Sequence, residues 1–311
     1  MLFTQMVGRT VLKDSSELEK QIQELNRIRP LASPSVQEVI DNDLKLLGMG
    51  LVGEKKVMFE LQNSHIPMYI IHDLYLEHNG LTAQIDYLVF CQRAIYVIEC
   101  KNLYGSIEVN NRGDFIRTVN FGKKYFKEGI YSPITQNQRH IDLLMEIEKE
   151  RQKGSIFSRL FGGSFINSFI PIVVLANDRT VLNDKYAKKE VKEKIIRADQ
   201  LVRYIKNSEA DGKSAKRNID ELRKYAEWLL SISATNTTDY LEKYRELERE
   251  VRKEKTPEKA SAPNNNKQYP PICPNCNIQM VKRVAKKGER QGKEFWGCPN
   301  WPKCRNIVNI E

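Results

Sequence analysis

The sequence lacks any long hydrophobic run. Its 311 residues contain no stretch that approaches the roughly 20 consecutive apolar residues of a transmembrane helix. Residues 1–14, MLFTQMVGRTVLKD, also lack the apolar segment of a secretory signal peptide. We therefore expect a cytoplasmic protein that does not bind a membrane.

Cysteine is scarce over most of the chain. Only two of the six cysteines, Cys91 and Cys100, precede residue 273. The other four lie near the carboxyl end with the spacing of metal ligands, and this spacing argues against a disulfide framework.

Positive charge exceeds negative charge by a moderate amount. The chain has 50 Lys and Arg residues against 40 Asp and Glu residues, a net charge of +10. This excess favours a polyanionic partner, although a moderate excess of lysine also occurs on ordinary solvated surfaces. The length and the hydrophobic fraction of 41% suffice for one core domain with smaller appendages.

Two short apolar segments contain the most informative charges. Residues 84–90 and 94–100 predict buried strands, because both are rich in Ile, Val and Tyr and are bounded by turn residues. Asp86, Glu99 and Lys101 lie in these strands or directly after them. A buried ion is costly unless it is paired or bound to a metal, so these three residues are the first candidates for chemistry.

Strand geometry predicts that the three charges meet. Glu99 and Lys101 are two residues apart and project to the same face, with Cys100 pointing away. A neighbouring antiparallel strand brings Asp86 beside them. Two carboxylates and a lysine suit Mg²⁺ or Mn²⁺ and a nucleophilic water. The alternative is that Asp86 caps a turn and that Glu99 and Lys101 form an ion pair at a strand end.

The same residues resemble a known superfamily. Asp86, followed by Glu99-Cys100-Lys101, is similar to the Asp…Glu-x-Lys motif of PD-(D/E)xK nucleases. Within that superfamily, residues 84–86, 97–102 and Gly105 resemble the nuclease-related domain called NERD, with Ile85 in place of the proline. The resemblance covers about half the chain, residues 47–178. It implies an α/β fold in which a helix, a three-strand meander, a helix and a strand form a mixed sheet flanked by helices.

The resemblance also implies catalytic roles. Asp86 and Glu99, with the backbone carbonyl of Cys100, would bind Mg²⁺ or Mn²⁺. Lys101 would orient the attacking water or help to deprotonate it. The activity implied is the hydrolysis of phosphodiester bonds in DNA.

Two further site residues come from helices. Gly53-Glu54 matches the Gly-Glu pair that precedes the strands in NERD-like domains, so Glu54 would reach the metal site as a ligand or a water-positioning base. Gln136 would order the substrate or the site, with His140 one turn later on the same helix face. The alternatives are a solvated glutamate and polar residues on a half-exposed helix.

Hydrophobic periodicity predicts the remaining elements. Strands are expected over residues 68–77, 106–109, 115–119, 169–176 and 194–196, and helices over 15–28, 35–47, 51–61, 132–149, 199–207, 216–231 and 239–255. Gly48 is expected to end the second helix. Residues 153–168 predict a loop, and His72 and His78 are expected to be ordinary sheet and turn histidines.

Composition divides the chain into four parts. We expect an N-terminal helical region over residues 1–46, a NERD-like domain with a helical extension over 47–234, a charged helix and flexible linker over 235–271, and a separate module over 272–311.

The last module contains a zinc motif. Cys273, Cys276, Cys298 and Cys304 form two knuckles, and four thiolates make a closed tetrahedral site for structural Zn²⁺. The knuckles closely resemble the zinc ribbons of bacterial type IA topoisomerases. Such a site leaves no open position for catalysis.

The surface expected around this zinc is basic and aromatic. Eight Lys and Arg residues lie between Cys273 and Arg305 against two Glu residues, and three aromatics lie among them. This mixture suits single-stranded nucleic acid, which stacks its bases on aromatic rings, although the aromatics also serve as the small core of a ribbon. The candidate nucleic-acid-binding residues are Lys282, Arg283, Lys286, Lys287, Arg290, Lys293, Phe295, Trp296, Trp301, Lys303 and Arg305.

The leading interpretation is a Mg²⁺-dependent DNA nuclease that is tethered to single-stranded or duplex DNA by its ribbon. A second is a catalytically silent nucleic-acid-binding adaptor that retains the nuclease fold. A third makes the helix at 239–255 a partner-docking element and the ribbon a protein-binding module.

Overall fold

The structure, a computed structural model, describes residues 8–122, 124–153, 165–211, 214–255 and 270–310. The chain divides into two compact units, Met1–Glu254 and Lys255–Glu311. The first contains the mixed sheet, and the second contains the four cysteines of the zinc motif.

The first unit is built on a six-stranded mixed sheet with the strand order β1-β2-β3-β4-β8-β10. Strands β2, β3 and β4 form the predicted antiparallel meander, and β8 lies parallel to β4. The strands are β1 Arg9–Asp14, β2 Met68–His78, β3 Leu81–Phe90, β4 Ile95–Lys101, β8 Phe169–Leu175 and β10 Ile195–Arg197. The expected α/β class with a mixed sheet is confirmed.

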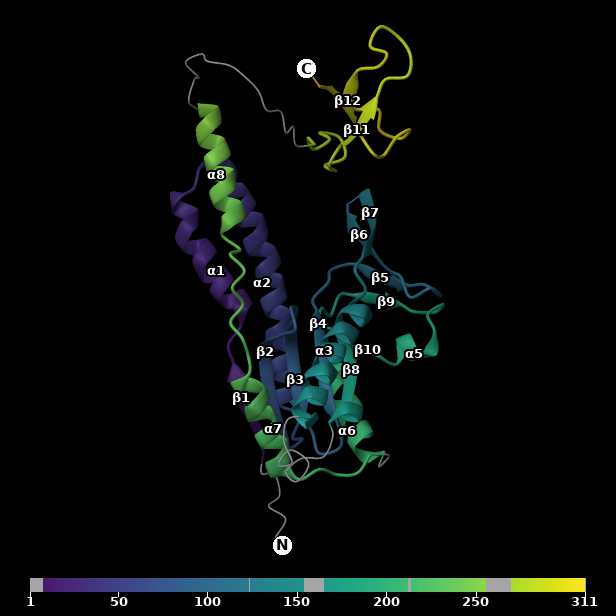
Figure 1. The fold of residues 1–311 in the computed structure, drawn as a ribbon. Coiled ribbons are helices and arrows are strands. Elements are labelled where there is room, and N and C mark those ends of the chain that lie inside the picture. The colour runs from purple at the N-terminus through teal and green to yellow at the C-terminus, as the bar shows by residue number, and fades with distance from the viewer. Residues whose placement is uncertain (1–7, 123, 154–164, 212–213, 256–269, 311) are drawn as a thin grey trace. The chain divides into compact units, whose positions relative to one another are not determined.

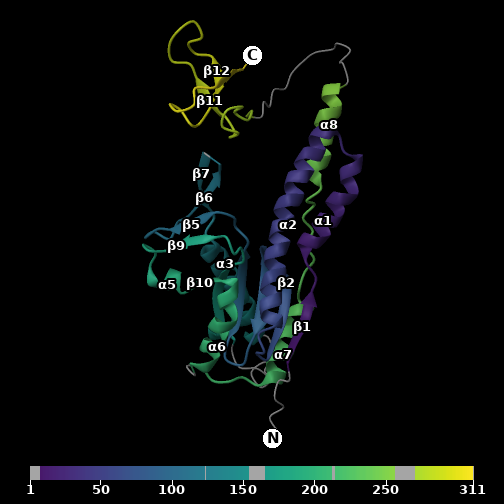
Figure 2. The same cartoon turned by 180° about the vertical axis from the view of Figure 1, so that it is seen from behind.

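Helices cover both faces of this sheet (Figures 1 and 2). Alternate residues of β4 point to opposite faces, so that Ile95 and Val97 enter one core while Tyr96 and Ile98 enter the other. Helices α3 (Pro133–Lys153) and α7 (Ile219–Ser231) cover the first face. Helices α2 (Pro34–Gln62) and α6 (Leu201–Ala210) cover the second. Each large apolar side chain buried in these cores contributes roughly 1.5–3 kcal/mol.

A second sheet lies at the carboxyl end of β8. Its strand order is β7-β6-β5-β9, and the strands predicted at residues 106–109 and 115–119 pair in it as an antiparallel hairpin. The strands are β5 Ser106–Val109, β6 Phe115–Phe121, β7 Lys124–Ile130 and β9 Val181–Asn183. Ile107 and Phe115 pack with Val173 and Leu175 of β8, which fixes this sheet to the main one.

One helix replaces the two predicted over residues 35–47 and 51–61, so the expectation that Gly48 ends a helix was wrong. A Cβ on Gly50 would lie 3.0 Å from Leu18 of helix α1 (Glu17–Ile28), so this glycine lets two helices approach. The continuous helix α2 runs through residue 47.

The amino-terminal strand β1 was not predicted. Its sequence, RTVLKD, has only two adjacent apolar residues and no alternation, and none of its residues is buried. It forms because β2 offers a free edge, with which it pairs in parallel from Arg9↔Met68 to Asp14↔His72.

Helix α8 (Glu242–Lys255) packs within the first unit. Its Tyr244 is buried with Leu25 and Ile40, and the Tyr244 hydroxyl donates a 2.7 Å hydrogen bond to Asp43. The charged helix predicted at 239–255 therefore has an intramolecular partner in α1 and α2.

Short elements complete the first unit. They are η1 Arg29–Leu31, η2 Ile166–Ser168, α5 Lys189–Lys192 and η3 Ala198–Gln200. Most of the loop predicted at 153–168 and of the linker predicted before residue 271 lies outside the described residues. Among the helices that are described, none has both the length and the hydropathy to span a membrane.

The second unit is a three-stranded antiparallel sheet with a small core. The strands are β11 Val281–Val284, β12 Glu294–Gly297 and β13 Ile307–Asn309. Met280 and Trp296 pack against three buried cysteines. So small a core needs a further source of folding free energy, which a metal can supply.

The glycines of α2 generate a prediction about stability. A Cβ on Gly53 would lie 2.6 Å from Asn102 Cβ, whereas a Cβ on Gly48 would meet nothing within 4 Å. We expect Gly53→Ala to lower the free energy of unfolding by about 1–3 kcal/mol through overpacking. The control Gly48→Ala should raise it by about 0.5–1 kcal/mol, because alanine favours a helix. Urea unfolding measures both changes, and equal effects would contradict the close contact at Gly53.

Candidate functional site

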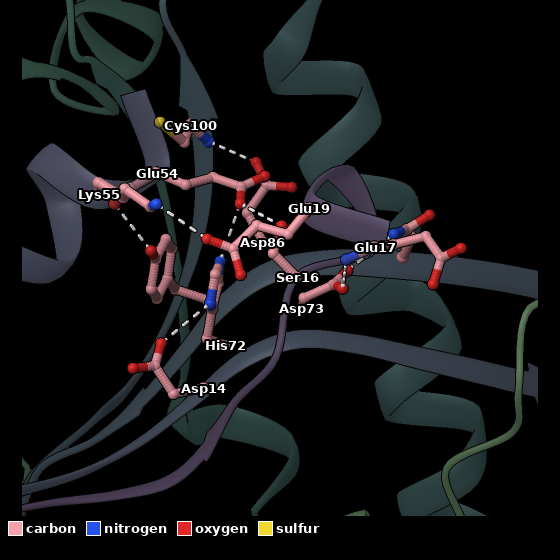
Figure 3. Close-up of polar contacts among 12 residues, drawn as sticks. Asp14, Ser16, Glu17, Glu19, Glu54, Lys55, His72, Asp73, Asp86 and Cys100 are labelled. Atoms are coloured by element: carbon pink, nitrogen blue, oxygen red, sulfur yellow. Dashed lines mark hydrogen bonds and ion pairs between the residues drawn. The ribbon is translucent and has the colours of Figure 1, made fainter. Parts of the chain in front are cut away.

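The candidate site begins with the close contact between α2 and β4. The position that a Gly53 Cβ would take is 2.6 Å from Asn102 Cβ and 3.3 Å from Cys100 Sγ, so only glycine lets the helix lie against the end of this strand. The next residue, Glu54, is buried, and its charge acts on Asp86 (Figure 3). The Gly-Glu pair thus combines a packing residue with an acidic one.

Asp86 lies where β3 and β4 separate. Tyr87↔Ile98 is the last pair between the two strands, and beyond it Asp86 Oδ2 accepts a 2.7 Å hydrogen bond from the Cys100 N–H. Ile85 and Leu88 enter the same core, so the regular alternation of β3 breaks at Asp86. The Asp86 carboxyl therefore occupies the fork between the strands.

Glu99 and Lys101 project from β4 toward α3. Glu99 is 1% exposed, and its Oε1 lies 2.5 Å from Lys101 Nζ. Lys101 Nζ also donates a 3.1 Å hydrogen bond to Gln136 Oε1. The other Glu99 oxygen, Oε2, lies 3.8 Å from His140 Nδ1 and has no hydrogen bond within the described structure.

The electrostatics of the site favour a cation. Burial and the neighbouring Glu99 raise the pKa of Asp86 well above its ordinary value, and burial raises the pKa of Glu99. Burial opposes the charged form of Lys101, but Glu99 outweighs it and raises the pKa of the amine. Burial and Lys101 lower the pKa of His140 to about 4, so this ring is neutral at pH 7. Lys101 thus offsets only part of the repulsion between the carboxyl groups.

Glu54 has neighbours that the sequence did not identify. Its Oε2 accepts a 2.8 Å hydrogen bond from Ser16 Oγ and lies 3.1 Å from His72 Nε2. The other His72 nitrogen, Nδ1, lies 3.4 Å from Asp14 Oδ1 (Figure 3). The sequence gives no sign of these contacts with Glu54 and His72. They form because strand β1, which was not predicted, brings Asp14 and the following Ser16 to Glu54 and His72.

The donors at the fork fit a hard divalent cation. Two carboxylates and the Cys100 carbonyl are oxygen ligands of the kind that Mg²⁺ prefers, and Glu99 Oε2 is a buried acceptor without a donor in the described structure. Glu54 adds a third acidic group. The side chains of Asp86, Glu99 and Glu54 are not gathered as tightly as the cysteines, whose four ligand atoms form the one described group within 4.8 Å of one another.

The four cysteines of the second unit form the zinc centre. Cys273, Cys298 and Cys304 are buried, and Asn306 Nδ2 lies 3.7 Å from Cys273 Sγ. Four sulfur ligands that converge in this way suit tetrahedral Zn²⁺. The zinc set that the spacing predicted is therefore supported.

The aromatic residues of the ribbon divide into core and surface. Trp296 is 8% exposed and belongs to the core, whereas Trp301 is 56% exposed with the Arg305 guanidinium 5.6 Å from its ring centroid. Phe295 and Arg283 are half-buried. The other candidate nucleic-acid-binding residues are exposed, namely Lys282, Lys286, Lys287, Arg290, Lys293, Lys303 and Arg305.

Comparison with protein families agrees with both parts of this description. Residues 49–176 match the model of the nuclease-related domain (NERD), and residues 271–311 match that of the topoisomerase DNA binding C4 zinc finger. The chain therefore contains one segment similar to the NERD domain and a second segment similar to the topoisomerase zinc finger. Neither a curated protein nor a solved structure matches the chain.

The repulsion at the fork generates a prediction about pH. Because the pKa of Asp86 is raised, the folded protein keeps a proton that the unfolded chain loses near pH ~4. Without Mg²⁺ or Mn²⁺, the free energy of unfolding should fall as pH rises from about 4 through that raised pKa. Asp86→Asn removes the charge but keeps an acceptor for Cys100, so we expect it to stabilise the protein at neutral pH by on the order of 1 kcal/mol.

Urea unfolding between about pH 5 and pH 8 in buffer free of Mg²⁺ and Mn²⁺ measures this effect. Asp199→Asn, which changes a 67% exposed side chain, is the control and should leave the pH dependence unchanged. A variant Asp86→Asn that is less stable than the wild type throughout would refute the expectation.

The zinc centre generates a separate prediction. Cys276→Ser removes one of four thiolates, so we expect the variant to lose its zinc and the fold of residues 270–310. Metal analysis measures the zinc content, and the change in tryptophan emission reports on Trp296 and Trp301 of this unit. Cys91→Ala is the control, because Cys91 lies in the core of the first unit and should leave the zinc content unchanged.

Proposed function

We propose that this protein is a divalent-metal-dependent nuclease that hydrolyses phosphodiester bonds in DNA and holds the DNA with its zinc ribbon. The observation that carries the proposal is that Asp86, at the fork between β3 and β4, lies within electrostatic reach of the ion-paired Glu99 and Lys101. A NERD domain and a DNA-binding type of zinc finger on one chain support the same conclusion.

In the proposed mechanism, Asp86, Glu99 and the Cys100 carbonyl would hold Mg²⁺ or Mn²⁺. A cation bound there would polarise the phosphate and stabilise the charge that develops on its oxygens. Lys101 stays cationic beside Glu99 and orients the attacking water. Gln136 fixes the Lys101 amine through their 3.1 Å hydrogen bond, and Glu54 provides a further acidic group at the site.

The ribbon supplies affinity in this proposal. Exposed lysines and arginines contact phosphates, and Trp301 with Arg305 offers a surface on which a base can stack. Stacking favours single-stranded DNA, whose bases are accessible. Trp296 maintains the fold of the ribbon instead, because it is buried.

One observation favours a second candidate function. Asp86, Glu99 and Glu54 do not form a compact ligand cluster of the kind that the cysteines form. A catalytically silent adaptor would keep the fold and bind nucleic acid without cutting it. Calorimetry distinguishes the two, because the adaptor would bind no divalent metal other than zinc.

Cleavage assays with Mg²⁺ or Mn²⁺ on single-stranded and duplex DNA test the proposed nuclease. We expect Asp86→Ala and Lys101→Ala each to lower the rate by at least about 100-fold, because each removes a group that acts on the water or the charge. Binding of DNA should persist. Lys189→Ala is the control, since it removes an 87% exposed lysine remote in sequence from the site. Wild-type cleavage by both site variants would refute the assignment.

The role of Trp301 gives a prediction about affinity. Trp301→Ala should weaken binding of single-stranded DNA by about 1–3 kcal/mol through lost stacking. Tyr186→Ala, which removes a 63% exposed aromatic from the first unit, is the control. Fluorescence anisotropy measures both affinities, and a salt titration separates phosphate contacts from stacking. Equal affinities for Trp301→Ala and the wild type would exclude this surface.

A further inference from the structure

We propose that His72, supported by Asp14, is a positioning residue that orients the Glu54 carboxylate toward the cation site. This inference rests on the proposed function, because it assigns to Glu54 a role at the metal. It adds Asp14, Ser16 and His72 to the candidate site. Asp14 and Ser16 lie outside the segment that matches the NERD model.

The His72 ring is fixed from several directions. It is 5% exposed and stacks on Tyr87 with the ring centroids 4.5 Å apart and the planes at 10°. The Tyr87 hydroxyl in turn donates a 2.8 Å hydrogen bond to the backbone carbonyl of Glu54. The ring and the helix turn that carries Glu54 therefore hold each other in place.

Both nitrogens of the ring face carboxylates. Nε2 lies 3.1 Å from Glu54 Oε2, and Nδ1 lies 3.4 Å from Asp14 Oδ1. The parallel pairing of β1 with β2 places Asp14 directly opposite His72, so the backbone ladder sets this contact. At this distance Nδ1 makes no hydrogen bond in the described structure, but a carboxylate beside the far nitrogen can orient a histidine, as it does for histidines around metal sites.

The contacts on Glu54 are confined to one of its oxygens. Oε2 receives the Ser16 hydroxyl and faces His72, whereas Oε1 has no hydrogen bond from any residue that the structure describes. Figure 3 draws the Glu54 carboxyl between His72 on one side and the Asp86 carboxyl on the other. The arrangement leaves Oε1 available to a cation or to its bound water.

Hydrogen bonds at the start of helix α1 hold Ser16 close to Glu54. Asp73, which follows His72, accepts a 2.5 Å hydrogen bond from the Glu17 N–H and a 2.7 Å hydrogen bond from Gln84 Nε2. These bonds attach the residues that follow Ser16 to strands β2 and β3. The Ser16 hydroxyl therefore donates its hydrogen bond to Glu54 and does not cap helix α1.

The test measures Mn²⁺ affinity by calorimetry, and kcat and KM for DNA cleavage, in the full-length protein. We expect His72→Leu to weaken Mn²⁺ binding about 10- to 100-fold and to lower kcat with little change in KM. His72→Gln, whose amide places a donor near the former Nε2, should recover most of the affinity. Asp14→Asn, a change at a 59% exposed side chain that the fold tolerates, should weaken binding in the same direction.

A double-variant cycle makes the test specific to Glu54. If His72 acts through Glu54, adding His72→Leu to Glu54→Gln should cause no further loss of affinity. The control is His78→Gln, a change on the same strand at a histidine that pairs with Glu150. It should leave Mn²⁺ affinity unchanged.

The outcomes separate this inference from the proposed function. Wild-type affinity and kcat in His72→Leu overturn the role of His72, and wild-type affinity in Asp14→Asn overturns that of Asp14. Additive losses in the double variant show that His72 does not act through Glu54. Absence of both Mn²⁺ binding and cleavage in the wild type overturns the proposed function itself, and the inference falls with it.

Discussion

The repulsion between buried carboxyl groups is the constraint on which the candidate site depends. Asp86 lies at a fork in the sheet where burial and the neighbouring Glu99 raise its pKa, and Lys101, which pairs with Glu99, offsets part of the cost of its charge. The surrounding core fixes this arrangement, because apolar residues fill both faces of β3 and β4 up to the fork. A fold that holds like charges together in this way gains stability when a cation binds between them.

The candidate site also depends on close packing at two glycines of α2. Glu54 reaches the fork because Gly53 lets α2 touch the end of β4, and Gly50 lets α1 lie on α2. Helix α2 packs against α1 and α8 through Val36 and Ile40, and it continues without interruption to Glu54 at the acidic site. The second unit is stabilised differently, since a few residues around four cysteines form its core and leave much of the folding free energy to the metal.

The sequence predicted what depends on short-range patterns. The meander, the buried strand β8 and the zinc ligands follow from apolar runs, turn residues and cysteine spacing, and Asp86, Glu99 and Lys101 stand out as charges within strands. It did not predict β1 or the continuity of α2, because β1 has no alternation and a glycine inside a helix, such as Gly48, has the same appearance in the sequence as one that ends it. The contacts of His72 could not be predicted for the same reason, since its partners Asp14 and Glu54 come from elements far apart in the chain.

Strand β1 forms one edge of the central sheet and has no buried residue. Edge segments with little buried surface open at lower free energy than the core of a domain. Opening of this strand would withdraw Asp14 from His72 and loosen Ser16, while the inner strands stayed paired. The order of Glu54 is thus tied to an edge strand that contacts the hydrophobic cores only through the partly buried Val11 and Leu12.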